Sequence, residues 1–147
     1  MKRIYVASPL QTISDRHFNK IVKDILIDLG YEVCLPQEFA VVPELAESLM
    51  KEKNIPYNEA HALAQVECWN YDLFYMKAAD ICFVVVNDRL GHGTCVEAGF
   101  MTAIHKEVIG IKPKDFDVGT VMNQIVKWTD YISIIDIQKV IKKAVSG

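Results

Sequence analysis

Hydrophobic residues in this chain follow two alternating patterns, short apolar runs and longer stretches with helical spacing. Residues 81–86 are apolar throughout and rich in β-branched and aromatic side chains, which is typical of a strand buried on both faces of a parallel sheet. Residues 18–29 instead repeat their apolar side chains every three or four positions, which indicates a helix that Gly30 ends. Strands are predicted at residues 3–7, 31–35, 81–86, 107–111 and 131–134.

The helical stretches lie between these runs. They are predicted at residues 14–29, 43–50, 57–77, 94–105, 118–128 and 135–145. The first strand, helix and strand form a βαβ unit, which is expected to be right-handed and parallel. The alternation predicts an α/β fold, a single doubly wound domain with a mainly parallel five-stranded sheet flanked by helices, of the Rossmann or flavodoxin-like kind. The length of 147 residues suits one domain, residues 1–147.

The polarity of the chain changes directly after the buried run. Residues 87–93 form a loop with two glycines, and a helix is expected to begin near Thr94. In an open α/β sheet, ligands bind in the crevice beyond the carboxyl ends of the strands. Glu97 would face that crevice from the first turn of the helix, and we predict that it is a nucleophile. The alternative is a capping box, in which Thr94 caps the helix and Glu97 reaches back to a backbone N–H.

Further candidate residues converge on this place if strands 3–7 and 81–86 are neighbours. Tyr5, Ser8 and Asp88 would then lie near Glu97, and Asp72 would enter from the preceding helix. Two carboxylates at one crevice suit glycosidic chemistry, because one attacks the sugar carbon and the other handles the proton of the leaving group. The alternatives are an aromatic core residue for Tyr5 and a solvated helix residue for Asp72.

Composition and charge narrow the function classes. The net charge of −3 gives no basic footprint for nucleic acid, and no apolar stretch is long enough to span a membrane. No signal peptide is expected, and the four cysteines show neither paired nor metal-ligand spacing, which is typical of a cytoplasmic protein. Cys95 has no base placed to activate it as a nucleophile. The histidines on helices lack metal-ligand spacing, so no metal site is expected.

Five short motifs in the same order resemble the nucleoside 2-deoxyribosyltransferase family over nearly the whole chain. Two of these motifs are strands. Residues 4–10 are similar to the first strand and loop of that family, and residues 29–36 are similar to its second strand. The segment Asn70-Tyr-Asp72-Leu followed by Ala79-Asp80 resembles its N-x-D-L…A-D pattern. Residues 93–99 resemble its nucleophile loop and helix, and residues 122–125 its late segment with an asparagine.

The resemblance implies a transferase that acts on deoxynucleosides and free nucleobases in nucleotide salvage. Glu97 would attack C1′ of the sugar, Tyr5 would hold Glu97 in line, and Asp72 would bind the base and move its proton. Asn123 would contact the sugar of a neighbouring subunit's site, which implies a homo-oligomer, a dimer or an assembly of dimers. The resemblance implies no metal and no cofactor.

One position departs from the family pattern. Gly91 stands where the family usually carries an aspartate that helps to bind the base, so Asp88 or His92 would have to take over. Gly91, His92 and Gly93 would then form the substrate-binding loop, although the default for His92 is a solvent-facing side chain.

Three other functions stay open at this point. A related group, the 2′-deoxynucleoside 5′-monophosphate N-glycosidases, has serine at the place of Gly91, but its phosphate loop matches residues 8–11 poorly. The G-x-G-T-x-x-E string is also similar to the nucleotide phosphoribohydrolases that release cytokinins, whose early glycine cluster is missing here. The third alternative is a nucleoside-binding module without catalysis.

Overall fold

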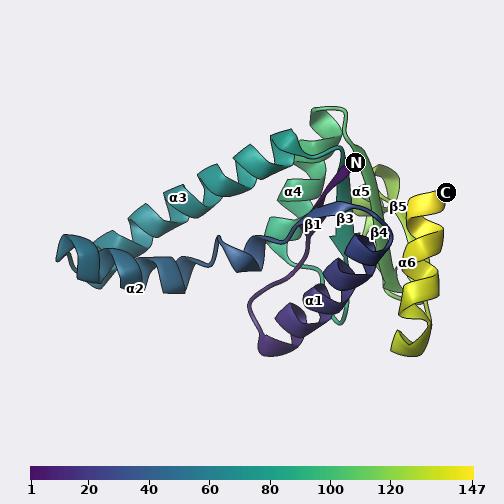
Figure 1. Ribbon diagram of the computed structural model, residues 1–147, viewed down its shortest axis with the longest axis horizontal. Coiled ribbons are helices and arrows are strands. Elements are labelled where there is room, and N and C mark those ends of the chain that lie inside the picture. The colour runs from purple at the N-terminus through teal and green to yellow at the C-terminus, as the bar shows by residue number, and fades with distance from the viewer.

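A five-stranded parallel sheet forms the centre of the computed structural model, which describes residues 1–147 (Figure 1). The strand order is β2-β1-β3-β4-β5, and all four neighbouring pairs are parallel. This arrangement confirms the predicted fold class. The strands are β1 (Arg3–Ala7), β2 (Glu32–Cys34), β3 (Ile81–Val85), β4 (Glu107–Pro113) and β5 (Lys127–Tyr131).

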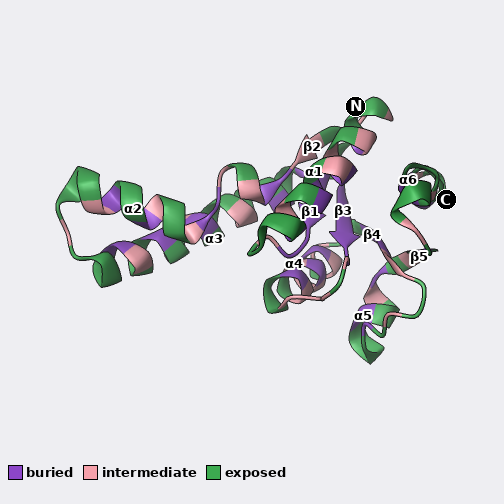
Figure 2. Ribbon diagram, turned by 90° about the horizontal axis from the view of Figure 1, so that it is seen from below, coloured by how far each residue is buried: buried purple, intermediate pink, exposed green.

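Helices cover both faces of the sheet. One face packs against α1 (Ile13–Asp28) and α6 (Ile137–Ser146), and the other packs against the end of α3 (Tyr57–Ala78), α4 (His92–Ala103) and α5 (Thr120–Ile125). The two separate apolar clusters on the two faces explain why β3 is buried along its whole length. Figure 2 shows the buried residues in the strands and on the helix sides that face them. The remaining elements are α2 (Val42–Lys53) and two 3₁₀ turns, η1 (Pro36–Glu38) and η2 (Ile134–Asp136).

The last strand lies earlier in the chain than its predicted position. The sequence predicts a strand at residues 131–134, but β5 covers Lys127–Tyr131, a segment whose first part is predicted to be the end of a helix. As an edge strand, β5 is buried fully only at Tyr131, so it lacks the continuous apolar run that marks β3. The apolar residues that suggested a strand stay outside, since Ile132 is 83% exposed.

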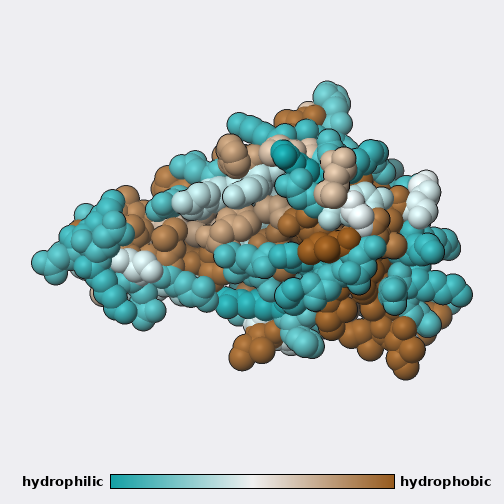
Figure 3. All heavy atoms as spheres, in the orientation of Figure 1, coloured by the Kyte–Doolittle hydropathy of each residue, from teal (hydrophilic) through white to brown (hydrophobic).

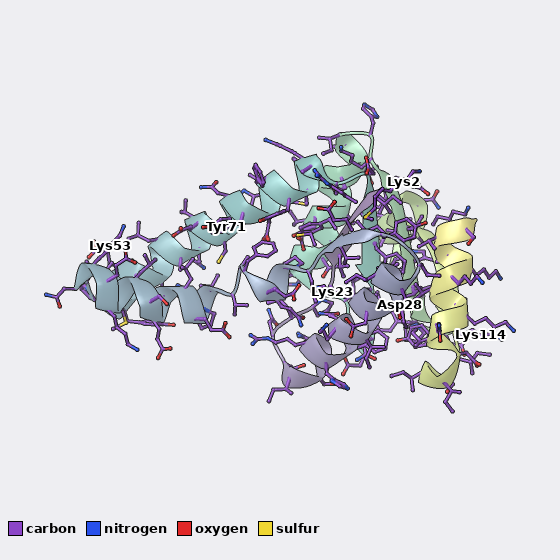
Figure 4. All side chains as sticks on the ribbon, in the orientation of Figure 1. Lys2, Lys23, Asp28, Lys53, Tyr71 and Lys114 are labelled. Carbon is purple, nitrogen blue, oxygen red and sulfur yellow. The ribbon has the colours of Figure 1, made fainter.

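Helices α2 and α3 form an antiparallel hairpin that projects from the sheet (Figure 1). A small cluster of Ala46, Leu49, Ala60 and Ala64 holds the pair together. Figure 4 labels Lys53 at the far end of the hairpin and Tyr71 part of the way back along α3. Figure 3 shows apolar surface on the hairpin as well as on the body. The returning helix α3 carries Asp72 towards the sheet, one residue after the exposed Tyr71.

Gly110 is the tightest point of the sheet. A Cβ at this position of β4 would lie 2.6 Å from the carbonyl oxygen of Val84 and 2.9 Å from the ring of Trp128. Only a hydrogen atom fits there, so the indole of Trp128 can lie close against β4, where its Nε1 donates to the carbonyl oxygen of Met122 at 3.1 Å. None of the helices combines the length and the apolarity that crossing a membrane requires.

Candidate active site

A cavity of about 430 Å³ lies at the carboxyl ends of β1 and β3. Four segments line it, which are the β1–α1 loop, the second half of α3, the β3–α4 loop and the start of α4. Because β1 and β3 are neighbours in register, with Tyr5 opposite Cys82, the loops that follow them meet at one edge of the sheet. The volume is within the range of small-molecule sites in proteins.

Tyr5 and Glu97 form the centre of the site. Tyr5 is fully buried in β1 and belongs to the cluster on the α4 side of the sheet. Its hydroxyl donates a hydrogen bond to Oε2 of Glu97, which lies on α4 and lines the cavity. A rigid strand and a helix therefore fix the direction of this carboxyl group, as a reacting group requires.

Burial governs the protonation of Glu97. It raises the pKa of Glu97 from an ordinary value of 4.5 to about 8, with the hydrogen bond from Tyr5 opposing the rise and the charge of Asp72 adding to it. Burial, followed by the charges of Glu97 and Asp72, also holds the pKa of Tyr5 far above its ordinary value. The phenol therefore stays protonated and remains a hydrogen-bond donor to Glu97.

Asp72 is the second carboxyl group of the cavity. Burial raises its pKa to about 6, and the Tyr5 hydroxyl opposes this rise. Its Oδ1 is buried and has no hydrogen-bond partner. A buried acceptor without a partner is unfavourable, so a ligand that brings an N–H group to Oδ1 would satisfy it. Two neighbouring carboxyl groups with raised pKa values are typical of acid–base sites.

The capping-box interpretation of Glu97 is wrong. Helix α4 begins at His92 rather than near Thr94, with Gly91 as its N-cap and no side-chain cap. The amide of Cys95 already donates to the carbonyl oxygen of Gly91 at 3.3 Å. Glu97 thus lies in the second turn, too far along to reach back to the N-cap. The glycines at 91 and 93 are poor helix formers, which is why the sequence indicated a loop there.

The other predicted residues fall into two groups. Ser8, Gly91, His92 and Gly93 line the cavity together with Glu97 and Asp72. Asp88 does not line it, because its side chain is exposed near Tyr131, whose pKa burial raises to about 12 with a contribution from the Asp88 charge.

Asn123 is also away from the cavity of its own chain. It is exposed on α5 and lines a different cavity, of about 320 Å³, with Lys112 and Phe116 among its neighbours. No group of three or more histidine, cysteine, aspartate or glutamate side chains is arranged to hold a metal ion.

Arg89 and Gln11 also line the cavity, although neither is among the candidate site residues that the sequence predicts. The Arg89 guanidinium donates from Nη1 to Oε1 of Gln11 at 2.9 Å and from Nη2 to Oδ2 of the buried Asp15. Burial alone would raise the pKa of Asp15, but hydrogen bonds from Arg89 and Thr12 outweigh it and hold that pKa below its usual range. The sequence feature that could have indicated a role for Arg89 is an arginine in the loop after the central strand, but arginines in loops are usually solvated.

The fold and the cavity define a class, an α/β protein with a small-molecule site at the carboxyl edge of a parallel sheet. A family model described as nucleoside 2-deoxyribosyltransferase matches residues 4–127. The chain therefore belongs to the nucleoside 2-deoxyribosyltransferase family.

Solved structures with the same fold share little sequence with this chain. The 2-deoxyribosyltransferase of Bacillus psychrosaccharolyticus is 22% identical, with a TM-score of 0.70 over 92% of this chain and 90% of that one. The CMP N-glycosidase BcmB of Clostridium botulinum is 15% identical, with a TM-score of 0.63 over 97% of each chain. A conserved protein from Enterococcus faecalis is 19% identical, with a TM-score of 0.58 over 97% of this chain and 98% of that one. No curated protein matches the sequence.

Proposed function

We propose that this protein transfers the 2-deoxyribosyl group between nucleobases through a covalent intermediate on Glu97. The hydrogen bond from the buried Tyr5 to Glu97 inside a cavity of nucleoside size carries the proposal. A half-buried carboxyl group that is held by a fixed donor is suited to attack a carbon centre. Membership of the deoxyribosyltransferase family supports the same reaction class.

In the first step, the carboxylate of Glu97 attacks C1′ and the bond from C1′ to the base nitrogen breaks. The base leaves with the electron pair of that bond and takes a proton from Asp72. In the second step, another base attacks C1′, gives its N–H proton to Asp72 and displaces Glu97 as a carboxylate. Two inversions at C1′ retain the configuration.

The raised pKa values of the two carboxyl groups describe how the pair is protonated before the reaction. With a pKa of about 8 on Glu97 and about 6 on Asp72, the pair holds one proton between these pH values. The proton lies mainly on Glu97, which has the higher pKa, and the reactive form is the minor one that carries the proton on Asp72 and leaves Glu97 ionised. Since the two groups interact, the two pKa values describe the pair.

We also propose that the site is completed by a second copy of the chain. Asn123 is exposed on α5 and does not line the cavity of Glu97, so it is free to reach the sugar in a neighbouring subunit's cavity. The functional unit is then a homo-oligomer of at least two chains.

A nucleotide N-glycosidase is the second candidate. Its support is the fold similarity to the CMP N-glycosidase of Clostridium botulinum over nearly the whole of both chains. Two features of the cavity speak against a nucleotide. Pro9 in the β1–α1 loop offers no backbone N–H to a phosphate, and Glu97 and Asp72 already supply negative charge.

The test is a base-exchange assay with a deoxynucleoside and a second free base. The proposal predicts a new deoxynucleoside, which the Glu97→Gln variant does not form and the Glu47→Gln control forms at the normal rate, because Glu47 is exposed on α2. Release of free deoxyribose alone would reject transfer, and cleavage of deoxynucleoside monophosphates only would select the glycosidase. Binding without turnover would indicate a nucleoside-binding module.

A further inference from the structure

Arg89 and Gln11 present hydrogen-bond donors to the cavity that the proposed reaction does not use. Arginine has only donors, so the atom of Gln11 that accepts from Nη1 at 2.9 Å is the amide oxygen. The NH₂ group of Gln11 is left without a protein partner. Arg89 uses two N–H groups on Gln11 and Asp15, and its side chain is 38% exposed, so further N–H groups remain for a ligand.

Besides the carboxyl groups of Glu97 and Asp72, the side chains around this pair that can accept a hydrogen bond are those of Ser8, His92 and Thr94, and each of these can also donate. Gly91 has no side chain, and a Cβ there would meet nothing closer than Oγ1 of Thr94, at 4.0 Å. Ser8 contributes a hydroxyl, which donates as well as accepts. The cavity wall formed by the two loops is therefore rich in donors and poor in acceptors.

Asp15, at the start of α1, holds Arg89 in position. Asp15, which is 3% exposed, accepts from Arg89 and from the backbone N–H of Thr12 at 3.2 Å, and its own N–H donates to the Thr12 hydroxyl at 3.0 Å. Asp15 thus orients the guanidinium and also cancels its charge. A bound group that matches Arg89 meets prearranged donors without a net positive field.

We propose that Arg89, together with Gln11, selects nucleobases with a carbonyl oxygen at the position that faces the guanidinium, such as the 6-carbonyl of hypoxanthine or the 4-carbonyl of uracil, over those with an amino group at that position, as in adenine or cytosine. The inference rests on the proposed function, because it assigns the base specificity of that site. A carbonyl oxygen accepts from the guanidinium, as the O6 and N7 edge of a 6-oxopurine does from arginine elsewhere. An amino group would bring donor against donor and leave both sides without a partner.

The charge of the cavity favours a neutral carbonyl over a phosphate as the group that Arg89 meets. Asp15 neutralises Arg89, and Glu97 and Asp72 line the same cavity. A phosphate dianion would meet repulsion from these carboxylates without a compensating excess of cations.

A competition assay tests the proposal. Thymidine serves as the sugar donor, hypoxanthine and adenine compete as acceptors at equal concentration, and the ratio of the two products at early time is measured. We expect hypoxanthine to be preferred over adenine by about tenfold or more, because one well-placed polar contact discriminates between bases by about this factor. Arg89→Met should bring the ratio close to one, while Arg3→Met, which removes an exposed arginine paired with Glu32, should leave it unchanged.

A second variant acts in the opposite direction. Gly91→Asp adds an acceptor where the structure has open space, and it should shift the ratio towards adenine. General damage to the fold would lower both products together and leave the ratio as it was. A ratio near one in the unmodified protein, or an unchanged ratio in Arg89→Met, would overturn the proposal.

A binding measurement distinguishes failure of the base-selection proposal from failure of the proposed transferase function. If no base is exchanged, equilibrium binding of hypoxanthine and of adenine to the Glu97→Gln variant still measures recognition, and equal affinities would overturn the assignment of Arg89. If instead thymidine 5′-monophosphate is cleaved and only this cleavage depends on Arg89, the guanidinium binds phosphate and the base-selection proposal is refuted.

Discussion

Replacing Glu97 with glutamine should stabilise the folded protein near neutral pH, although it should abolish the proposed reaction. Glutamine has nearly the same shape, and its Oε1 can still accept the hydrogen bond from the Tyr5 hydroxyl. The variant lacks only the charge that burial disfavours. Its stability therefore measures the electrostatic cost of keeping an ionisable carboxyl group in this cavity.

The size of the effect follows from the two pKa values of Glu97. The group titrates at about 8 in the folded protein and at its ordinary value of 4.5 when exposed, so the folded state holds the proton more tightly. Stability is then greatest below the ordinary value and is lost as the pH rises towards the folded value. At about 1.4 kcal/mol for each pH unit between these values, the loss is about 3 kcal/mol at pH 7.

Urea unfolding of both proteins between pH 4 and pH 9 measures this loss. We expect equal free energies of unfolding at pH 4 and a growing advantage of Glu97→Gln above pH 5. Glu47→Gln, in an exposed position on α2, should track the unmodified protein at every pH. A difference between Glu97→Gln and the unmodified protein that does not change with pH would refute the burial of an ionisable Glu97.

Further predictions concern the neighbours of Glu97 and the sheet. Tyr5→Phe removes the donor to Glu97 and should lower kcat/KM for base exchange by about 10- to 100-fold, the usual worth of a hydrogen bond to a charged group. The pH profile of kcat/KM should be bell-shaped with limbs near 6 and 8, and Tyr5→Phe should move the upper limb to higher pH, because the lost bond lowered the pKa of Glu97. Asp72→Asn should lower the exchange rate about 10²- to 10⁴-fold, as loss of a proton-transfer group does, without loss of Tm. Gly110→Ala should cost about 1–3 kcal/mol in urea unfolding, because its Cβ would lie 2.6 Å from the Val84 carbonyl oxygen.

The centre of the fold follows directly from local sequence patterns. A parallel strand buried on both faces must be apolar at every position, so residues 81–85 are recognisable without knowledge of the rest of the chain. The carboxyl ends of neighbouring parallel strands then meet at one edge. That rule brings Glu97 to the edge where β1, the strand of Tyr5, also ends, whereas Asp72 enters from helix α3, whose course the rule does not fix.

Other features depend on surroundings that the sequence does not contain. The edge strand β5 is half exposed and is held by Trp128 against Gly110, a fit that only the assembled sheet creates. Asp88 and Arg89 are adjacent in one polar loop, but Asp88 is exposed away from the cavity and Arg89 lines it. The direction of a loop side chain depends on its partners, and the partner of Arg89 is Asp15, 74 positions earlier in the chain.

Intact-protein mass spectrometry of a rapidly acid-quenched reaction tests the role of Glu97 most directly. The protein is mixed with thymidine in the absence of a second base, and the quenched chain is weighed and then digested to find the modified peptide. We expect a mass increase of one 2-deoxyribosyl group, carried by the peptide that contains Glu97 and absent in Glu97→Gln. Thymine release without any adduct, or an adduct that persists in Glu97→Gln, would contradict nucleophilic attack by Glu97.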